Sequence, residues 1–208
     1  GYQYGGKKYS RINEVRQIRS SIATLKHSLL ISYLDSNAKL SEFDEYSEII
    51  SAKVNKEVLH FEPVEFNHPI WILYSSGTTG KPKAITHSHG GILLEHYKYM
   101  AFHNDVKEGE NYFWFSTTGW MMWNFMLSSL LMKASIVIYD GSPGFPNMDV
   151  LWKLAEEVPI THFGTSAPYL TACLKKGLDI KNNFDLSALR SISSTGAPLP
   201  EETFEYVY

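Results

Sequence analysis

The chain has 208 residues and a mass of 23.7 kDa, enough for one large domain or two small ones. Hydrophobic residues make up 44% and charged residues 20%, a globular composition that excludes disorder, coiled coil and collagen. No stretch approaches about 18 consecutive apolar residues, so the sequence predicts no membrane span. The net charge of −3 and the pI near 6.3 disfavour a duplex nucleic-acid binder, and we expect no nucleic-acid partner.

Cysteine usage and the two ends of the sequence bear on its cellular setting. Cys173 is the single cysteine, which excludes an intramolecular disulfide framework and suits a reducing compartment. The start at Gly1 shows no signal-peptide pattern, so we expect a cytoplasmic protein. Because Gly1 is not Met and Tyr208 falls inside a predicted helix, we expect the chain to be a piece of a larger protein.

The first third of the chain carries two charge clusters of opposite sign. Residues 1–34 are basic and residues 35–66 are acidic, which is typical of solvated surfaces; a phosphate partner for Lys7 or Lys8 is the alternative. Apolar residues at three- and four-residue steps predict a helix over 11–26. A strand over 29–34, a short acidic helix over 41–51 and a polar connector over 52–68 follow.

From residue 69 onward, short apolar runs alternate with helical patterns. The predicted strands cover 70–74, 112–115, 135–139, 160–163 and 190–193. The predicted helices cover 91–102, 120–132, 149–158 and 168–176, and Pro200 opens a last one. The helix over 120–132 is apolar nearly all round and is expected to be buried. This alternation predicts an α/β fold with layered, mostly parallel sheets.

A loop rich in glycine and hydroxyl side chains follows the strand over 70–74. Its glycines let the backbone approach a ligand, and successive free N–H groups form an anion-binding concavity. Its lysines add the positive charge that a polyphosphate needs. We therefore predict binding to nucleotide phosphates by Ser75, Ser76, Gly77, Thr78, Thr79, Gly80, Lys81 and Lys83.

Two other readings of this loop are weaker. A Walker loop needs four residues between its glycines and a hydroxyl after the lysine, whereas Gly77 and Gly80 are three apart and Pro82 follows Lys81. A mobile linker of small polar residues is the other alternative, but linkers rarely follow a buried strand and end in Lys-Pro-Lys.

Five motifs in this order resemble the acyl-adenylate-forming superfamily and, within it, the acetoacetyl-CoA synthetases. The motifs are SSGTTGKPKAI (75–85), SHGG (88–91), TTGWMMWN (117–124), FGTSA (163–167) and STGAPL (194–199). Two residues depart from the wider pattern: Ala84 stands where the superfamily usually has Gly, and Ala197 where acetyl-CoA synthetases have Glu. The first departure also fits the acetoacetyl branch.

The resemblance implies part of the large N-terminal domain of an acyl-CoA synthetase-like fold. Residues 1–68 would be an incomplete N-terminal portion of an α/β subdomain plus the connector, and residues 69–208 a nucleotide- and acyl-binding α/β region. The implied enzyme is a ligase that converts acetoacetate, ATP and CoA, with Mg²⁺, into acetoacetyl-CoA, AMP and pyrophosphate. The AMP/Mg motif and the C-terminal domain of the same chain would lie beyond residue 208. No catalytic residue is assigned, and the piece alone is expected to be inactive.

The same resemblance assigns two further groups of residues. It places Trp120, Met121, Met122 and Thr195 at the acyl pocket, where the residues alone would favour core packing for the run at 120–123. It places Gly196, Ala197 and Pro198 beside adenine and ribose, where the residues alone would favour an ordinary strand-to-helix turn.

Histidines near the loop do not form a recognisable metal site. His87, His89, His96 and His103 lack cysteine or carboxylate partners at suitable spacing, so we assign no metal ligands. Three other functions stay open: an acetate- or propionate-type ligase, a non-catalytic nucleotide-binding module, and a scaffold, which would leave the glycine-rich loop unexplained.

Overall fold

The computed structural model describes residues 1–52, 59–75 and 80–208. Ser76, Gly77, Thr78 and Thr79 of the predicted phosphate loop therefore lie outside the described residues. Contacts divide the chain into two compact units, residues 1–61 and 62–208, and each is described by itself. Across the described ranges, no helix has both the length and the apolar composition needed to cross a membrane.

The first unit is made of short elements with little buried surface. A two-glycine turn with positive φ at Gly5 and Gly6 joins the antiparallel strands of a hairpin that was not predicted. Leu40 is the one apolar side chain of this unit that is buried among the described residues. The elements are β1 (Tyr2–Tyr4), β2 (Lys7–Tyr9), α1 (Ile12–Ser21), β3 (Leu29–Leu30), β4 (Asp44–Glu45) and α2 (Tyr46–Ser51).

Three predictions for this unit were too long. Helix α1 ends at Ser21 rather than at residue 26, because the Ser20 and Ser21 hydroxyls both donate to the Gln17 carbonyl and compete with the helical hydrogen bonds. The strand predicted over 29–34 covers two residues. The helix predicted over 41–51 begins at Tyr46, because β4 pairs in parallel with β3 just before it.

A parallel four-stranded sheet forms the centre of the second unit. Its strand order is β10-β9-β7-β8, and every neighbouring pair is parallel. The bounds are β7 (Asn111–Trp114), β8 (Ser135–Val137), β9 (His162–Ser166) and β10 (Ser191–Thr195). The predicted α/β class is confirmed.

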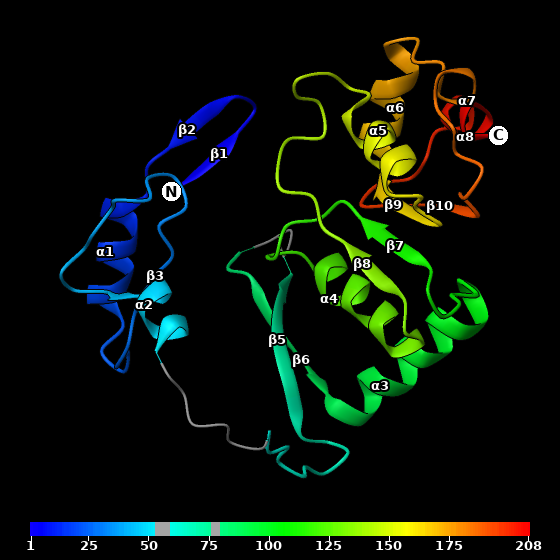
Figure 1. Cartoon of the computed structure of the whole chain (residues 1–208). Coiled ribbons are helices and arrows are strands. Elements are labelled where there is room, and N and C mark those ends of the chain that lie inside the picture. Colours follow the sequence, from blue (N-terminus) through cyan, green and yellow to red (C-terminus); the bar gives the residue numbers. More distant parts are fainter. Residues whose placement is uncertain (53–58, 76–79) are drawn as a thin grey trace. The chain divides into compact units, whose positions relative to one another are not determined.

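Helices cover both faces of this sheet (Figure 1). On one face, Trp152 of α5 stacks on Phe163 of β9 with ring centroids 4.4 Å apart. On the other face, Phe125 of α4 meets Trp114 of β7 edge-on at 5.6 Å. The helices of this unit are α3 (His89–Lys98), the π-helix η1 (Tyr99–His103), α4 (Met121–Leu127), the 3-10 helix η2 (Ser128–Met132), α5 (Val150–Glu157), α6 (Ala167–Lys175), α7 (Ile180–Asn183) and α8 (Glu201–Val207).

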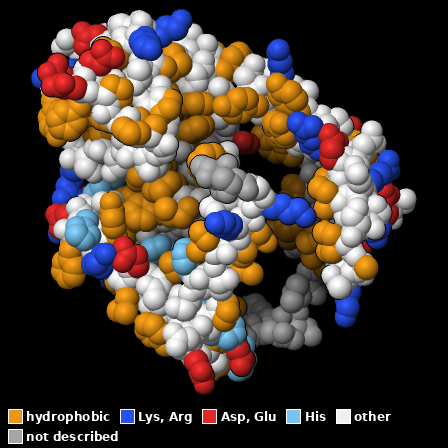
Figure 2. Space-filling view, turned by 180° about the vertical axis from the view of Figure 1, so that it is seen from behind, with side chains coloured by type: hydrophobic (Ala, Val, Ile, Leu, Met, Phe, Trp, Pro, Cys, Tyr) orange, Lys and Arg blue, Asp and Glu red, His pale blue; other side chains and the backbone are white. Residues whose placement is uncertain are grey.

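The helix predicted over 120–132 differs from its prediction in two ways. It is the short helix α4 followed by the 3-10 turn η2. It is also not buried all round: Phe125 and Met126 face the core, whereas Trp120 and Met121 are exposed. Figure 2 shows that hydrophobic side chains are exposed on the face of the molecule drawn there.

A separate antiparallel hairpin precedes the sheet. Strand β5 (Pro69–Ser75) pairs with β6 (Lys83–Ser88), which was not predicted. The Trp71 Nε1–H donates to His87 Nδ1 across the two strands at 2.8 Å. The Ser88 hydroxyl then accepts from the Gly91 N–H at 3.2 Å and caps helix α3.

The amino ends of three sheet strands are joined by polar contacts. Arg190, just before β10, binds the carboxylates of Asp105 (2.8 Å) and Glu110. Buried His162 at the start of β9 lies 3.6 Å from the Glu110 carboxylate through Nδ1, and its Nε2 lies 2.9 Å from the Asn104 carbonyl oxygen. We call Asp105, Glu110, His162 and Arg190 the amino-end cluster.

Candidate substrate-binding site

A cavity of about 370 Å³ lies at the carboxyl ends of β7, β9 and β10. Open parallel sheets bind their ligands at this edge, because the loops that leave the strands gather there. Residues from all three strands, from the loop after β7 and from the starts of α4 and α6 contribute. The lining residues are Trp114, Phe115, Ser116, Thr117, Trp120, Met122, Thr165, Ser166, Pro168, Thr195 and Gly196.

Three of the four residues predicted for the acyl pocket meet in this cavity. Trp120 and Met122 line it from the start of α4, and Thr195 lines it from the end of β10. Met121, at the first turn of α4, is 53% exposed and is not among the lining residues. Neighbours in sequence are thus separated because adjacent helical positions point in different directions.

The residues predicted for the adenine side divide between this cavity and a depression next to it. Gly196 lines the cavity and has φ +88°, a conformation that favours glycine. Ala197 and Pro198 line the neighbouring depression of about 350 Å³. Pro168 borders both hollows, so the two are adjacent.

The described part of the predicted phosphate loop stands at the tip of the hairpin. Ser75 and Lys83 pair across β5 and β6 where the loop leaves the strands. Gly80, with φ +149°, and Lys81 are exposed. Among Ser75, Gly80, Lys81 and Lys83, none lines the cavity.

The lining of the cavity is apolar with a few hydroxyl groups. Ser116, Thr117, Ser166 and Thr195 can donate or accept hydrogen bonds, and no charged side chain occurs among the described lining residues. Such a site suits a small, largely apolar group with a polar substituent. The charge of a bound carboxylate or phosphate needs partners outside this lining.

The lone cysteine does not contribute to this chemistry. Cys173 is fully buried in α6, and burial raises the pKa of its thiol. A nucleophilic cysteine needs the opposite shift and some exposure. Over the described ranges, no group of three or more His, Cys, Asp or Glu side chains could hold a metal ion.

Sequence reasoning did not assign seven residues that line the cavity: Trp114, Phe115, Ser116, Thr117, Thr165, Ser166 and Pro168. A signal was present for six of them, which lie at or just after the carboxyl end of a predicted strand or in a motif that carried the resemblance. Pro168 was instead the first residue of a predicted helix. Trp114 was predicted to be part of the buried strand over 112–115. The apolar pattern of that strand does not distinguish a core residue from one that lines a cavity.

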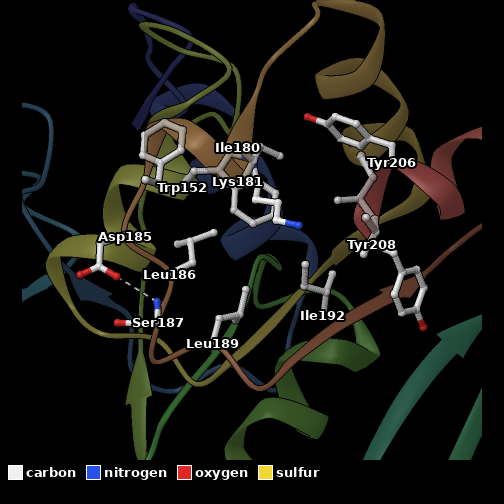
Figure 3. A pocket seen from close by; sticks show the side chains of 13 residues that line it. Trp152, Ile180, Lys181, Asp185, Leu186, Ser187, Leu189, Ile192, Tyr206 and Tyr208 are labelled. Carbon is white, nitrogen blue, oxygen red and sulfur yellow. Dashed lines mark hydrogen bonds between the residues drawn. The ribbon is translucent and has the colours of Figure 1, made fainter.

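A larger cavity of about 440 Å³ lies elsewhere in the second unit, bounded by α5, α6, β10 and the last turn of α8. Figure 3 shows Trp152, Leu186, Leu189, Ile192 and Tyr208 around it. The Asp185 carboxylate accepts a hydrogen bond from the Ser187 N–H at 3.0 Å on its rim. None of the described residues predicted for a site lines it, and it is not at the carboxyl edge of the sheet, so volume alone does not identify the functional cavity.

Comparison with known proteins agrees with the motifs. The AMP-binding enzyme family matches residues 7–208. Acetoacetyl-coenzyme A synthetase of Rhizobium meliloti (strain 1021) is 41% identical over 211 residues, which cover 100% of this chain and 32% of that protein. Acetoacetyl-CoA synthetase of Xenopus tropicalis is 37% identical over 215 residues, which cover 99% of this chain and 32% of that protein.

A solved structure shares the fold. Acetoacetyl-CoA synthetase from Streptomyces lividans superposes with a TM-score of 0.90 at 44% identity, over 100% of this chain and 31% of that one. The chain therefore spans about a third of the length of the relatives it matches. The resemblance inferred from the five motifs is confirmed, and the chain belongs to the AMP-binding enzyme family.

Proposed function

We propose that the chain is part of an ATP-dependent ligase that activates acetoacetate as an acyl-adenylate and transfers the acyl group to CoA. Family membership and the names of the similar proteins support this activity. The observation that carries the site assignment is the cavity at the carboxyl edge of the sheet, which Trp120, Met122 and Thr195 line together. We propose residues 1–68 as an incomplete subdomain with its connector and residues 69–208 as the nucleotide- and acyl-binding region.

The proposed reaction needs two things from the protein. A carboxylate is a weak nucleophile, so it must be held in line with the α-phosphate of ATP. Charge that develops on the phosphates must also be stabilised by positive groups and N–H donors. We propose Ser75, Ser76, Gly77, Thr78, Thr79, Gly80, Lys81 and Lys83 for the phosphates. Gly196, Ala197 and Pro198 are proposed for the adenosine side, and Trp120, Met122 and Thr195 for the acyl group; Met121, which does not line the cavity, is not proposed to contact it.

Mg²⁺ is the metal expected with ATP, where it would neutralise phosphate charge. The described residues do not supply a cluster of His, Cys, Asp or Glu side chains that would hold it. CoA enters as the second substrate, whose thiol attacks the acyl carbon and releases AMP.

The test is acid-dependent pyrophosphate exchange by the complete polypeptide that contains this chain. Acetoacetate, acetate, propionate and butyrate are compared at equal concentration. We expect the highest kcat/KM for acetoacetate and thioester formation once CoA is added. Exchange that is fastest with acetate or propionate would replace the proposed substrate, and no exchange with any acid would refute the ligase.

A further inference from the structure

Trp114, which lines the cavity, is paired with Gly164, which does not. The two residues are direct partners in the pairing of β7 with β9, and the Phe115 N–H donates to the Gly164 carbonyl oxygen at 2.8 Å. A Cβ atom placed on Gly164 would lie 2.2 Å from both Cδ2 and Cε3 of the Trp114 indole. The indole therefore lies directly over the Gly164 backbone, in the space that any other residue's side chain would take.

The indole is fixed in this position from the other side as well. Trp114 is 8% exposed, and the Phe125 ring of α4 meets it edge-on. Residues that follow on the same three strands (Ser116, Ser166 and Thr195) line the cavity next to it. Because Trp114 itself belongs to both the lining and the core, it is the wall between them.

We propose that Trp114, laid flat over Gly164, sets the depth of the acyl cavity and so limits the site to short acyl chains. This inference rests on the proposed ligase function and adds two specificity-determining positions to it. Gly164 acts through Trp114: its missing side chain lets the indole lie against the sheet. A bulkier residue at 164 would push the indole into the cavity, and a smaller one at 114 would deepen it.

The test compares three variants of the complete polypeptide on acetate, acetoacetate and 3-oxohexanoate. Trp114→Leu should raise kcat/KM for 3-oxohexanoate relative to acetoacetate by about tenfold or more, the discrimination that one or two methylenes give in an apolar pocket. Gly164→Ala should lower kcat/KM for acetoacetate by about tenfold or more and spare acetate. The Gly164→Ala/Trp114→Leu double variant should recover activity, because the added methyl group collides with the indole.

A matched control separates depth from general loosening of the core. Trp123→Leu makes the same truncation in a tryptophan that packs on the same core cluster but does not line the cavity. It should keep the wild-type ranking of acids. Thermal unfolding of each variant shows whether it is folded before its kinetics are compared.

The outcomes distinguish failure of the depth-setting role of Trp114 from failure of the proposed ligase function. If the wild type activates none of the acids, the proposed ligase fails. If the wild type activates acetoacetate but folded Trp114→Leu keeps its ranking, the depth-setting role is wrong. If Gly164→Ala is damaged and the double variant is equally damaged, the glycine acts otherwise than through Trp114. Two results together would establish that Trp114 and Gly164 act as a pair: the double variant recovers activity, and Trp114→Leu changes the ranking of the acids.

Discussion

Met121 and Met122 are adjacent in sequence but occupy different surroundings. Met122 lines the cavity and packs beside the core around Trp114 and Phe125, whereas more than half of Met121 is exposed. The resemblance assigned the same role to both. Only the position of each on α4 separates the residue that lines the cavity from the one that does not.

Alanine substitutions at these two positions give a direct test. Met122→Ala should enlarge the cavity and shift the ranking of acids toward longer chains by about tenfold, because each methylene accommodated contributes at about that level. Met121→Ala should leave the ranking as in the wild type. Pyrophosphate exchange over the acid panel measures both, and a larger shift for Met121→Ala would contradict the placement of the two side chains.

His96 is a buried titratable group beside the hairpin. It lies between the Trp71 and Phe125 rings, with centroids 5.9 and 6.3 Å away, and is 8% exposed. Burial lowers the pKa of His96 below its usual value, nearby His87 lowers it further, and Glu95 opposes both. The folded state therefore binds fewer protons at this site than the unfolded state does.

This difference predicts that His96 makes stability depend on pH. Its contribution is fully present above about pH 6.5, the pKa of an unperturbed histidine, and is lost as pH falls below that value and the unfolded chain takes up the proton. Urea unfolding at pH 7.5, 6.5 and 5.5 should show a steeper loss on acidification in the wild type than in His96→Gln. The exposed His103→Gln control should follow the wild type, and a wild-type slope in His96→Gln would contradict the prediction.

Regular elements with one apolar face were predictable from the sequence, and elements held by tertiary pairing were not. Helix α5 agrees with its prediction to within one residue at each end, because its apolar stripe is buried against the sheet. Strand β6 was missed because four of the six residues in its sequence, KAITHS, are polar and it is defined by pairing with β5. Local patterns do not report such a partner.

The junction between β6 and α3 depends on a single serine. Ser88 ends the strand and caps the helix, so it positions the hairpin that carries the predicted phosphate loop. Ser88→Ala should lower the free energy of unfolding by about 1 kcal/mol, the usual cost of an N-cap. Ser88→Asp keeps an acceptor and should lose less. Chemical denaturation measures both, and equal losses would show that the cap does not stabilise this junction.

The two units differ in how much apolar surface they bury. The second contains two clusters of buried residues on the two faces of its sheet. The first has Leu40 as its buried apolar residue among those described, and Ile18, Leu25 and Leu29 are exposed. The sequence could not show this, because helical spacing lines up an apolar face whether or not another element covers it.

Hydrogen exchange should separate the two units. We expect amides of α1 to exchange far faster than those of β7 and β9, because local stability follows buried apolar contacts. Mass spectrometry of the intact chain after short deuterium pulses measures this. Protection of α1 equal to that of β7 would contradict the difference in packing.

The amino-end cluster has a consequence for how this sheet can vary. Arg190 and its two carboxylate partners fasten the strands at the end opposite the cavity. These contacts join the starts of the strands without using any side chain that lines the cavity. Substitutions among the cavity-lining residues would leave these contacts in place, so a lineage could acquire a preference for a different acid while keeping the amino-end cluster.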